Sequence, residues 1–209
     1  MFTKLRKSTA VLLVITLICM LVPAQAETAD TSALFGTISG DTYENTFVGM
    51  GCLLEGWHYY TDAEIEATNQ LTMEKVSEDI QDLINQNITV MAAETADSLM
   101  NVNIQIRNVQ EYVSVYNQYG LTFIAESSLD QFKSSLESSG MSDVQLSLGS
   151  MNIGGNDIPY IGGQYGLSGF TLYFRQLWVL RGDFLVYLTA TTIMTDRTDE
   201  VFSHFYLLP

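Results

Sequence analysis

Hydrophobic and polar residues alternate along the chain with different periods, and each period predicts either a helix or a strand. Apolar residues recur at three- and four-residue steps over 73–84 and 121–139, which predicts two amphipathic helices. Thr61 and Glu64 have the spacing of a capping box, which predicts a helix start. A short closing helix is expected over 198–206.

Strand-like patterns occupy most of the remaining sequence. Polar residues alternate with Val102, Ile104 and Ile106, which predicts a strand with one polar or solvated face. The two longest β-rich runs, 170–180 and 184–193, are separated by Arg181-Gly182-Asp183 and predict a hairpin. Shorter strands are expected over 43–48, 50–54, 88–94, 144–148 and 158–161.

This order of elements predicts an α+β fold, in which helices flank a central, mainly antiparallel sheet. Residues 27–40 carry little periodicity and are interpreted as a flexible leader. The folded part is expected to be one α+β domain over 41–209, a length that fits a single core.

The first 26 residues have the pattern of an export signal. Three basic residues precede an uncharged apolar run over 10–22, and Ala24 and Ala26 then form an Ala-x-Ala site. We expect cleavage after Ala26, hence a secreted or extracytoplasmic protein with no stable membrane span after processing. The run is short for a spanning helix, which disfavours an uncleaved anchor. A lipid anchor on Cys19 is disfavoured because Ile18 precedes it, where lipoprotein processing needs a small side chain.

Charge narrows the class of partner. The whole chain has a formal net charge of −15, and cleavage would remove three of its nine basic residues and none of its 24 acidic ones. A mature domain with a net charge near −18 repels phosphate groups. We therefore expect neither nucleic acid nor an anionic membrane to be a partner. Only Cys52 would remain after cleavage, so no intramolecular disulfide is expected.

The opening of the domain resembles a known family. Tyr43-Glu44-Asn45-Thr46-Phe47-Val48-Gly49-Met50, followed by Leu53-Leu54-Glu55-Gly56-Trp57, is similar to the first strand and turn of the PsbP-like fold. Leu54 stands where that family usually has proline. The resemblance implies an α-β-α sandwich with helices on both faces of the sheet. Family members bind photosystem subunits, a Ran-type GTPase or unknown partners, and none of those interfaces transfers residue by residue.

Patterns that carry enzymatic or metal chemistry are largely missing. Neither His58 nor His204 accompanies a nucleophile-elbow motif, and no zinc, thiol-pair or EF-hand pattern occurs. The glycines of 162–166 are followed by no helix or lysine, so they do not form a phosphate loop. We therefore expect no enzyme, no cofactor and no metal, although a Cys52–His58 pair keeps a hydrolase as a weak alternative.

Aromatic residues provide the one candidate binding surface. Trp57, His58, Tyr59 and Tyr60 stand together at an expected junction between strand and helix, where they serve either the core or recognition. The leading hypothesis is a non-enzymatic interaction domain that binds a protein or cell-envelope partner through this surface. The alternative is a small-molecule binder with an apolar pocket between sheet and helix.

Overall fold

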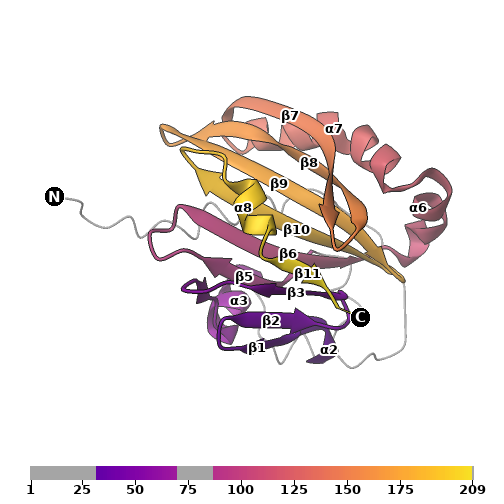
Figure 1. Ribbon diagram of the computed structural model, residues 1–209. Helices are drawn as coiled ribbons and strands as arrows, with labels where there is room; N and C mark the ends of the chain where they lie inside the picture. Colours follow the sequence, from indigo (N-terminus) through magenta and orange to yellow (C-terminus); the bar gives the residue numbers. More distant parts are fainter. Residues whose placement is uncertain (1–31, 70–86, 209) are drawn as a thin grey trace.

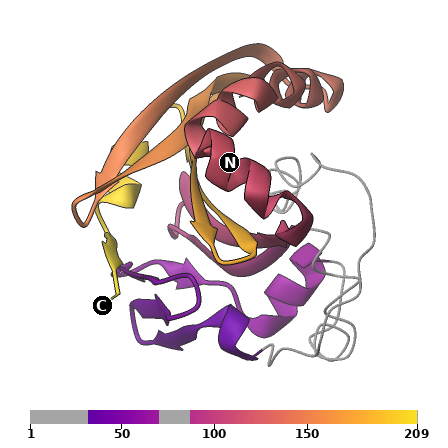
Figure 2. The ribbon, with the colours of Figure 1, turned by 90° about the vertical axis from the view of Figure 1, so that its right-hand side faces the viewer.

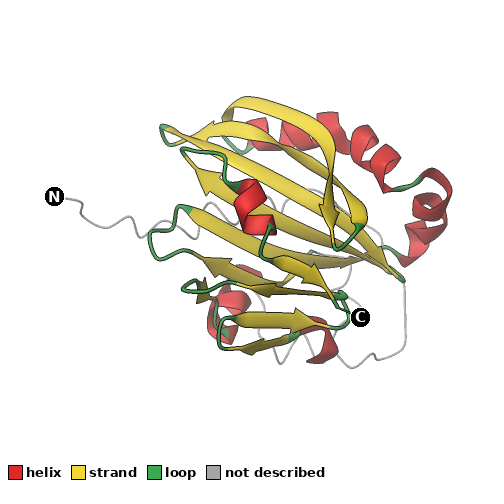
Figure 3. Ribbon diagram, in the orientation of Figure 1, coloured by secondary structure: helices red, strands yellow, loops and turns green. Residues whose placement is uncertain are grey.

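The computed structural model describes residues 32–69 and 87–208, and strands are its main element (Figures 1 and 3). The strands form two antiparallel sheets. The small sheet has the order β1-β2-β3-β11. Its strands are β1 (Thr37–Ser39), β2 (Thr42–Asn45), β3 (Met50–Leu53) and β11 (Phe205–Leu207).

The large sheet has the order β4-β5-β6-β10-β9-β8-β7. Long, nearly uninterrupted registers join its last strands, so this part of the sheet is a continuous curved surface. The strands are β4 (His58–Tyr59), β5 (Ile88–Glu94), β6 (Met100–Asn108), β7 (Ser142–Ile153), β8 (Asn156–Leu167), β9 (Phe170–Arg181) and β10 (Phe184–Ile193).

Few helices accompany these sheets in the described residues. Figure 2 shows α6 and α7 along one face of the large sheet, while the small sheet lies on the other side. The helices are α2 (Ser32–Phe35), α3 (Asp62–Asn69), the 3₁₀ turn η2 (Gln110–Tyr112), α6 (Val113–Tyr119), α7 (Leu121–Ser138) and α8 (Thr198–Phe202).

The predicted fold class is therefore wrong. A helix-flanked α+β sandwich was expected, whereas the second layer over the large sheet is another sheet. The short strands near the start pair with each other and with β11, and they do not extend the large sheet. An amphipathic strand can bury its apolar face against a sheet as well as a helix can, so periodicity alone did not identify the layers.

The closing helix is also shorter than predicted. Helix α8 ends at Phe202, and the chain then turns into β11, where Phe205 pairs with Cys52 of β3. Val201, Phe202 and Phe205 fit helical spacing, which suggested a single helix. The distant partner strand β3 decides the conformation of the last residues.

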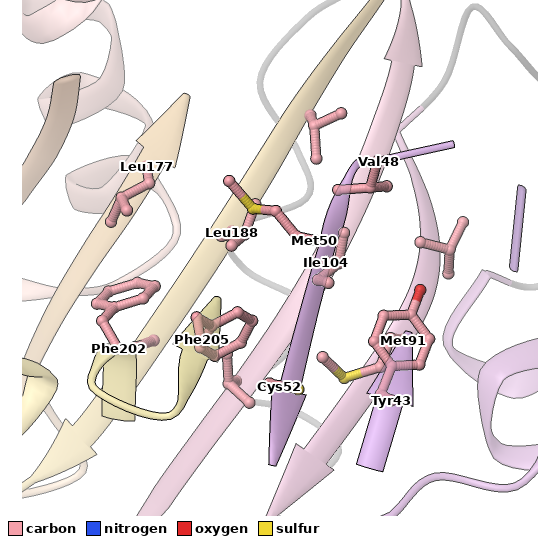
Figure 4. Packing of buried hydrophobic residues seen from close by; sticks show 14 of the residues in the cluster. Tyr43, Val48, Met50, Cys52, Met91, Ile104, Leu177, Leu188, Phe202 and Phe205 are labelled. Atoms are coloured by element: carbon pink, nitrogen blue, oxygen red, sulfur yellow. The ribbon is translucent and has the colours of Figure 1, made fainter. Parts of the chain in front are cut away.

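The main hydrophobic core lies between the two sheets. Figure 4 shows side chains from the small sheet, including Met50 and Cys52, facing Ile104, Leu177 and Leu188 of the large sheet. All five side chains are fully buried. A second core lies on the other face of the large sheet, where Phe132 and Leu136 of α7 pack against β8, β9 and β10.

The polar face of β6 is buried. Asn103 and Gln105 are 4% and 3% exposed, so the expectation that this face could be solvated is not met. The amide of Gln105 donates to the Thr89 hydroxyl at 3.2 Å. Hydrogen bonds of this kind offset the cost of burying polar groups.

Two local predictions are confirmed. The backbone N–H of Thr61 donates to the Glu64 carboxylate at 2.8 Å at the start of α3, as a capping box requires. The predicted hairpin is formed by β9 and β10. The helix predicted over 73–84 and the export signal both lie outside the described residues.

Candidate binding pocket on the large sheet

The four predicted site residues lie at the β4 edge of the large sheet, but they do not share one surface. Trp57 and Tyr59 pack against the core between the sheets, and the Tyr59 hydroxyl donates to the backbone carbonyl of Asp41 at 3.0 Å. Tyr60 packs with a separate small cluster around Ile65. Alternation along the strand separates neighbouring side chains in this way.

His58 and Tyr60 are the two members of this group that remain together. Their ring centroids are 6.0 Å apart, and His58 pairs with Glu64 at 3.4 Å. Burial, with Glu94 nearby, raises the pKa of Tyr60 to about 12, so its hydroxyl is neutral at physiological pH. The pair forms a small polar and aromatic surface, whereas Trp57 and Tyr59 contribute to the fold.

Cys52 is fully buried, and its thiol lies 3.7 Å from the Tyr59 hydroxyl. Burial raises the pKa of this thiol from 9.0 to about 11. A buried neutral thiol is a poor nucleophile. His58 makes its contacts with Glu64 and Tyr60, so the structure does not bring Cys52 and His58 together as a catalytic pair.

We expect the Cys52 thiol to lower stability at alkaline pH. Its pKa is raised in the folded protein, so the unfolded chain loses this proton first, and the free energy of unfolding falls as pH rises from about 9 to 11. The thiol should not react with a thiol reagent at pH 8 in buffer but should react in urea. Cys52→Ser should remove part of the alkaline loss, and rapid labelling of native Cys52 would contradict the assignment.

A cavity of about 370 Å³ lies on the large sheet, over β7, β8 and β9, and is bordered by Asp196, which precedes α8. It opens on the face that also carries the small sheet, because Tyr160 at its border packs against the core between the sheets. We call it the Arg175 pocket. It is lined by Gln145, Leu146, Ser147, Tyr160, Gly162, Gly163, Gln164, Tyr173, Phe174, Arg175 and Asp196.

Arg175 is the central charged group of this pocket. Its guanidinium forms a two-pronged ion pair with Asp199 of α8 and lies 3.7 Å from Asp196. It also lies over the Tyr160 ring, 5.2 Å from the centroid. Burial alone would lower the pKa of Arg175, but the ion pair with Asp199 raises it above its usual value. The guanidinium is fixed in position, and its charge is balanced by two carboxylates.

Glycines make room for this arrangement. Gly162 pairs with Arg175 across β8 and β9, and a Cβ at 162 would lie 3.0 Å from the Arg175 Cγ. A Cβ at Gly149 would overlap the phenol ring of Tyr160. Glycine in a strand interior is typical of such close approaches. The Arg175 side chain therefore lies close to the backbone of Gly162, and the Tyr160 ring lies close to the backbone of Gly149.

The charges in and around the pocket disfavour an anionic ligand. Asp196 lines the pocket together with Arg175, Asp199 pairs with Arg175 from α8, and the whole chain is strongly acidic. The remaining polar lining consists of amides and hydroxyls, which form hydrogen bonds without adding charge. A cationic or neutral polar group is therefore favoured over an anion.

Sequence reasoning missed this pocket. The glycines of 162–166 were tested only as a phosphate loop, whereas they lie within β8. The signal was present in the glycines, since they interrupt a strand pattern without a turn. Arg175 and Tyr160 could not be joined without the register of β8 and β9.

Among the described residues, no set of three or more His, Cys, Asp and Glu side chains is grouped for metal binding. No helix within these residues has the length and apolar character needed to span a membrane.

No protein-family model matches the chain, and no curated protein matches it. One similar solved structure is PA94 from Pseudomonas aeruginosa, a protein of unknown function described as a putative regulator, at 18% identity and a TM-score of 0.28. The match covers 50% of this chain and 63% of PA94, so the chain spans less than two thirds of it. Another is LpqN of Mycobacterium tuberculosis, involved in cell envelope biogenesis, at 14% identity, a TM-score of 0.31, and coverage of 57% and 72%. These likenesses are distant, and the PsbP-like resemblance is not confirmed.

Proposed function

We propose that this protein is an exported, non-enzymatic interaction domain that binds a basic segment of a protein or envelope partner in the Arg175 pocket. The observation that carries the proposal is the pocket itself, which is lined by Asp196, Arg175 and neutral polar residues, while Asp199 of α8 pairs with the Arg175 guanidinium. Export is supported by the leader sequence.

Several features support binding without chemistry. Gln145 and Ser147 are exposed, so they can exchange hydrogen bonds with water for hydrogen bonds with a partner. Tyr160 and Tyr173 offer aromatic surface beside the carboxylates, which suits the aliphatic stem and charged end of lysine or arginine. The polar lining does not suit the apolar small molecule of the alternative hypothesis.

A binding comparison tests the proposal. We expect a labelled hexalysine peptide to bind the protein, and a hexaglutamate peptide not to bind. Asp196→Asn should weaken hexalysine binding by up to about five-fold, because a partly exposed charge pair contributes about 0.2–1 kcal/mol. Fluorescence anisotropy at physiological salt measures both affinities.

Asp183→Asn is the matched control, since Asp183 is exposed in the turn between β9 and β10 and does not line the pocket. Asparagine at 196 keeps an oxygen that can accept from the Thr198 N–H and hydroxyl, as Asp196 does at 3.0 and 2.6 Å. An equal loss in both variants would mean that general charge, and not the pocket, attracts the peptide.

A further inference from the structure

Strand β7 forms the free rim of the large sheet. Within the part of the chain that the structure describes, it is last in the strand order and pairs only with β8, at the upper rim in Figure 1. None of the backbone hydrogen bonds among the described residues satisfies its outer side from Gln145 to Asn152. A row of unpaired N–H and C=O groups of this length is a template for a further strand.

This rim lacks the usual protection against pairing. A register shift between Ser142 and Gln145 and a positive φ of 53° at Asp143 distort only the start of β7. From Gln145 to Ile153 the register with β8 is unbroken. The ten residues 144–153 contain no charge and no proline, in a chain with 24 acidic residues. Natural edge strands usually carry such residues because they block pairing.

The side chains of β7 are complementary to themselves. Leu146 and Leu148 are half-buried on the α7 side, where they pack against the second core, and Gln145 and Ser147 are exposed on the other side. If two β7 strands run antiparallel with Ser147 opposite Ser147, each Leu146 lies opposite the other copy's Leu148. Gln145 then lies opposite Gly149, and no like charges meet.

We propose that β7 is a self-association surface at which a second copy of this chain adds antiparallel, making one sheet continuous across a two-fold axis. The same patch serves both copies, as a two-fold interface requires. The covered leucines and the backbone hydrogen bonds favour pairing, and the uncharged strand avoids local repulsion in an acidic protein. The inference does not depend on the ligand of the Arg175 pocket.

Antiparallel pairing through β7 would also determine where the two Arg175 pockets lie in the dimer. A two-fold axis perpendicular to the sheet keeps equivalent faces on the same side. Gln145 and Ser147 line the pocket from β7 itself, so the two pockets would lie on one surface, on either side of the axis. A partner with two basic segments could then bind both pockets, which increases the overall affinity without new contacts.

Analytical ultracentrifugation over a concentration series tests the proposal. The wild-type protein should approach twice the monomer mass, and more strongly at higher salt. Added salt shortens the Debye length from about 30 Å at 0.01 M to about 8 Å at 0.15 M and so screens the net repulsion between copies. A wild-type protein that remains monomeric up to millimolar concentration at high salt would overturn the proposal.

Ser147→Lys separates strand pairing from general charge effects. It reduces the net negative charge of each copy, but it places two lysines opposite each other at the axis, so dimerisation should weaken by up to about five-fold. Thr171→Lys is the control, because Thr171 is exposed on β9, away from the rim, and changes the charge equally. Equal dimerisation of the two variants would contradict pairing through β7.

A second pair of variants tests the interface by disulfide cross-linking and does not weaken it. Ser147→Cys places two thiols opposite each other across the axis, within the Cβ separation of about 4.5–5.5 Å typical of directly opposed strand residues. Oxidised glutathione should convert this variant to a covalent dimer faster than it converts Thr171→Cys. Circular dichroism confirms that both variants are folded. Equal rates of dimer formation would overturn the proposed register and the interface.

Discussion

Replacing Asn45 with alanine is expected to lower the free energy of unfolding by about 3–5 kcal/mol, since several buried groups lose their partner at once. The Asn45 side chain is fully buried and donates to the Leu34 carbonyl at 2.7 Å and to the Tyr43 hydroxyl at 2.8 Å. Its own oxygen accepts from the Val48 N–H at 2.9 Å. Alanine would leave all three groups without a partner beneath the small sheet. Urea unfolding followed by circular dichroism measures the loss.

Asn152→Ala is the matched control for this prediction. Asn152 also forms two side-chain hydrogen bonds, to Asp157 at 2.9 Å and from the Gly155 N–H at 3.1 Å, but it is exposed. Water can replace those partners, so we expect a loss below about 1 kcal/mol. Similar losses at positions 45 and 152 would show that the buried network does not stabilise the small sheet.

Replacing Gly163 with alanine is expected to disrupt the pairing of β7 with β8 and to cost about 3 kcal/mol or more. A Cβ at 163 would overlap the carbonyl oxygen of Gln145, and it would also lie 2.9 Å from the carbonyl carbon. Both atoms belong to the backbone of the partner strand, so relief requires the strands to separate. Hydrogen exchange of the β7 amides, together with urea unfolding, measures the effect.

Gly162→Ala provides the comparison at the neighbouring residue. A Cβ there would lie 3.0 Å from side-chain carbons of Arg175 and Tyr160, which can move, and 3.2 Å from the Phe174 carbonyl oxygen. We expect a cost of about 1–2 kcal/mol, with β7 still protected from exchange. If Gly162→Ala exposes the β7 amides as much as Gly163→Ala does, the account of the β7–β8 contact is wrong.

Local patterns predicted the elements whose cause is local. The capping box at Thr61 and Glu64 and the turn between β9 and β10 depend on residues close in sequence, and both are present. Helix α7 begins and ends near the expected residues, with Gly140 at a φ of 87° just beyond it. Short-range hydrogen bonds and backbone preferences determine these features.

Elements with distant partners were harder to predict. Phe205 becomes part of a strand because it pairs with Cys52, more than 150 residues earlier, and β3 pairs with β11 and β2 instead of joining the large sheet. The Arg175 pocket likewise depends on the registers that bring Gly162 beside Arg175 and Tyr160 over Gly149. The register between two strands cannot be predicted from a single sequence.

The aromatic group at Trp57 to Tyr60 illustrates a related difficulty. Four aromatic or heteroaromatic residues in a row suggest a surface, but alternation packs Tyr59 against the core between the sheets and leaves His58 exposed. Alanine at 59 would therefore remove packing against the core and would not test binding alone. The pair of His58 and Tyr60 remains a candidate surface that can be compared directly with the Arg175 pocket.

Chemical-shift mapping of the ¹⁵N-labelled protein during titration with hexalysine tests the central claim most directly. We expect the perturbed amides to cluster around the Arg175 pocket, on β7 near Gln145, on β8 near Gln164, on β9 near Arg175, and at Asp196. Perturbations centred on His58 and Tyr60, or spread evenly over the acidic surface, would contradict it.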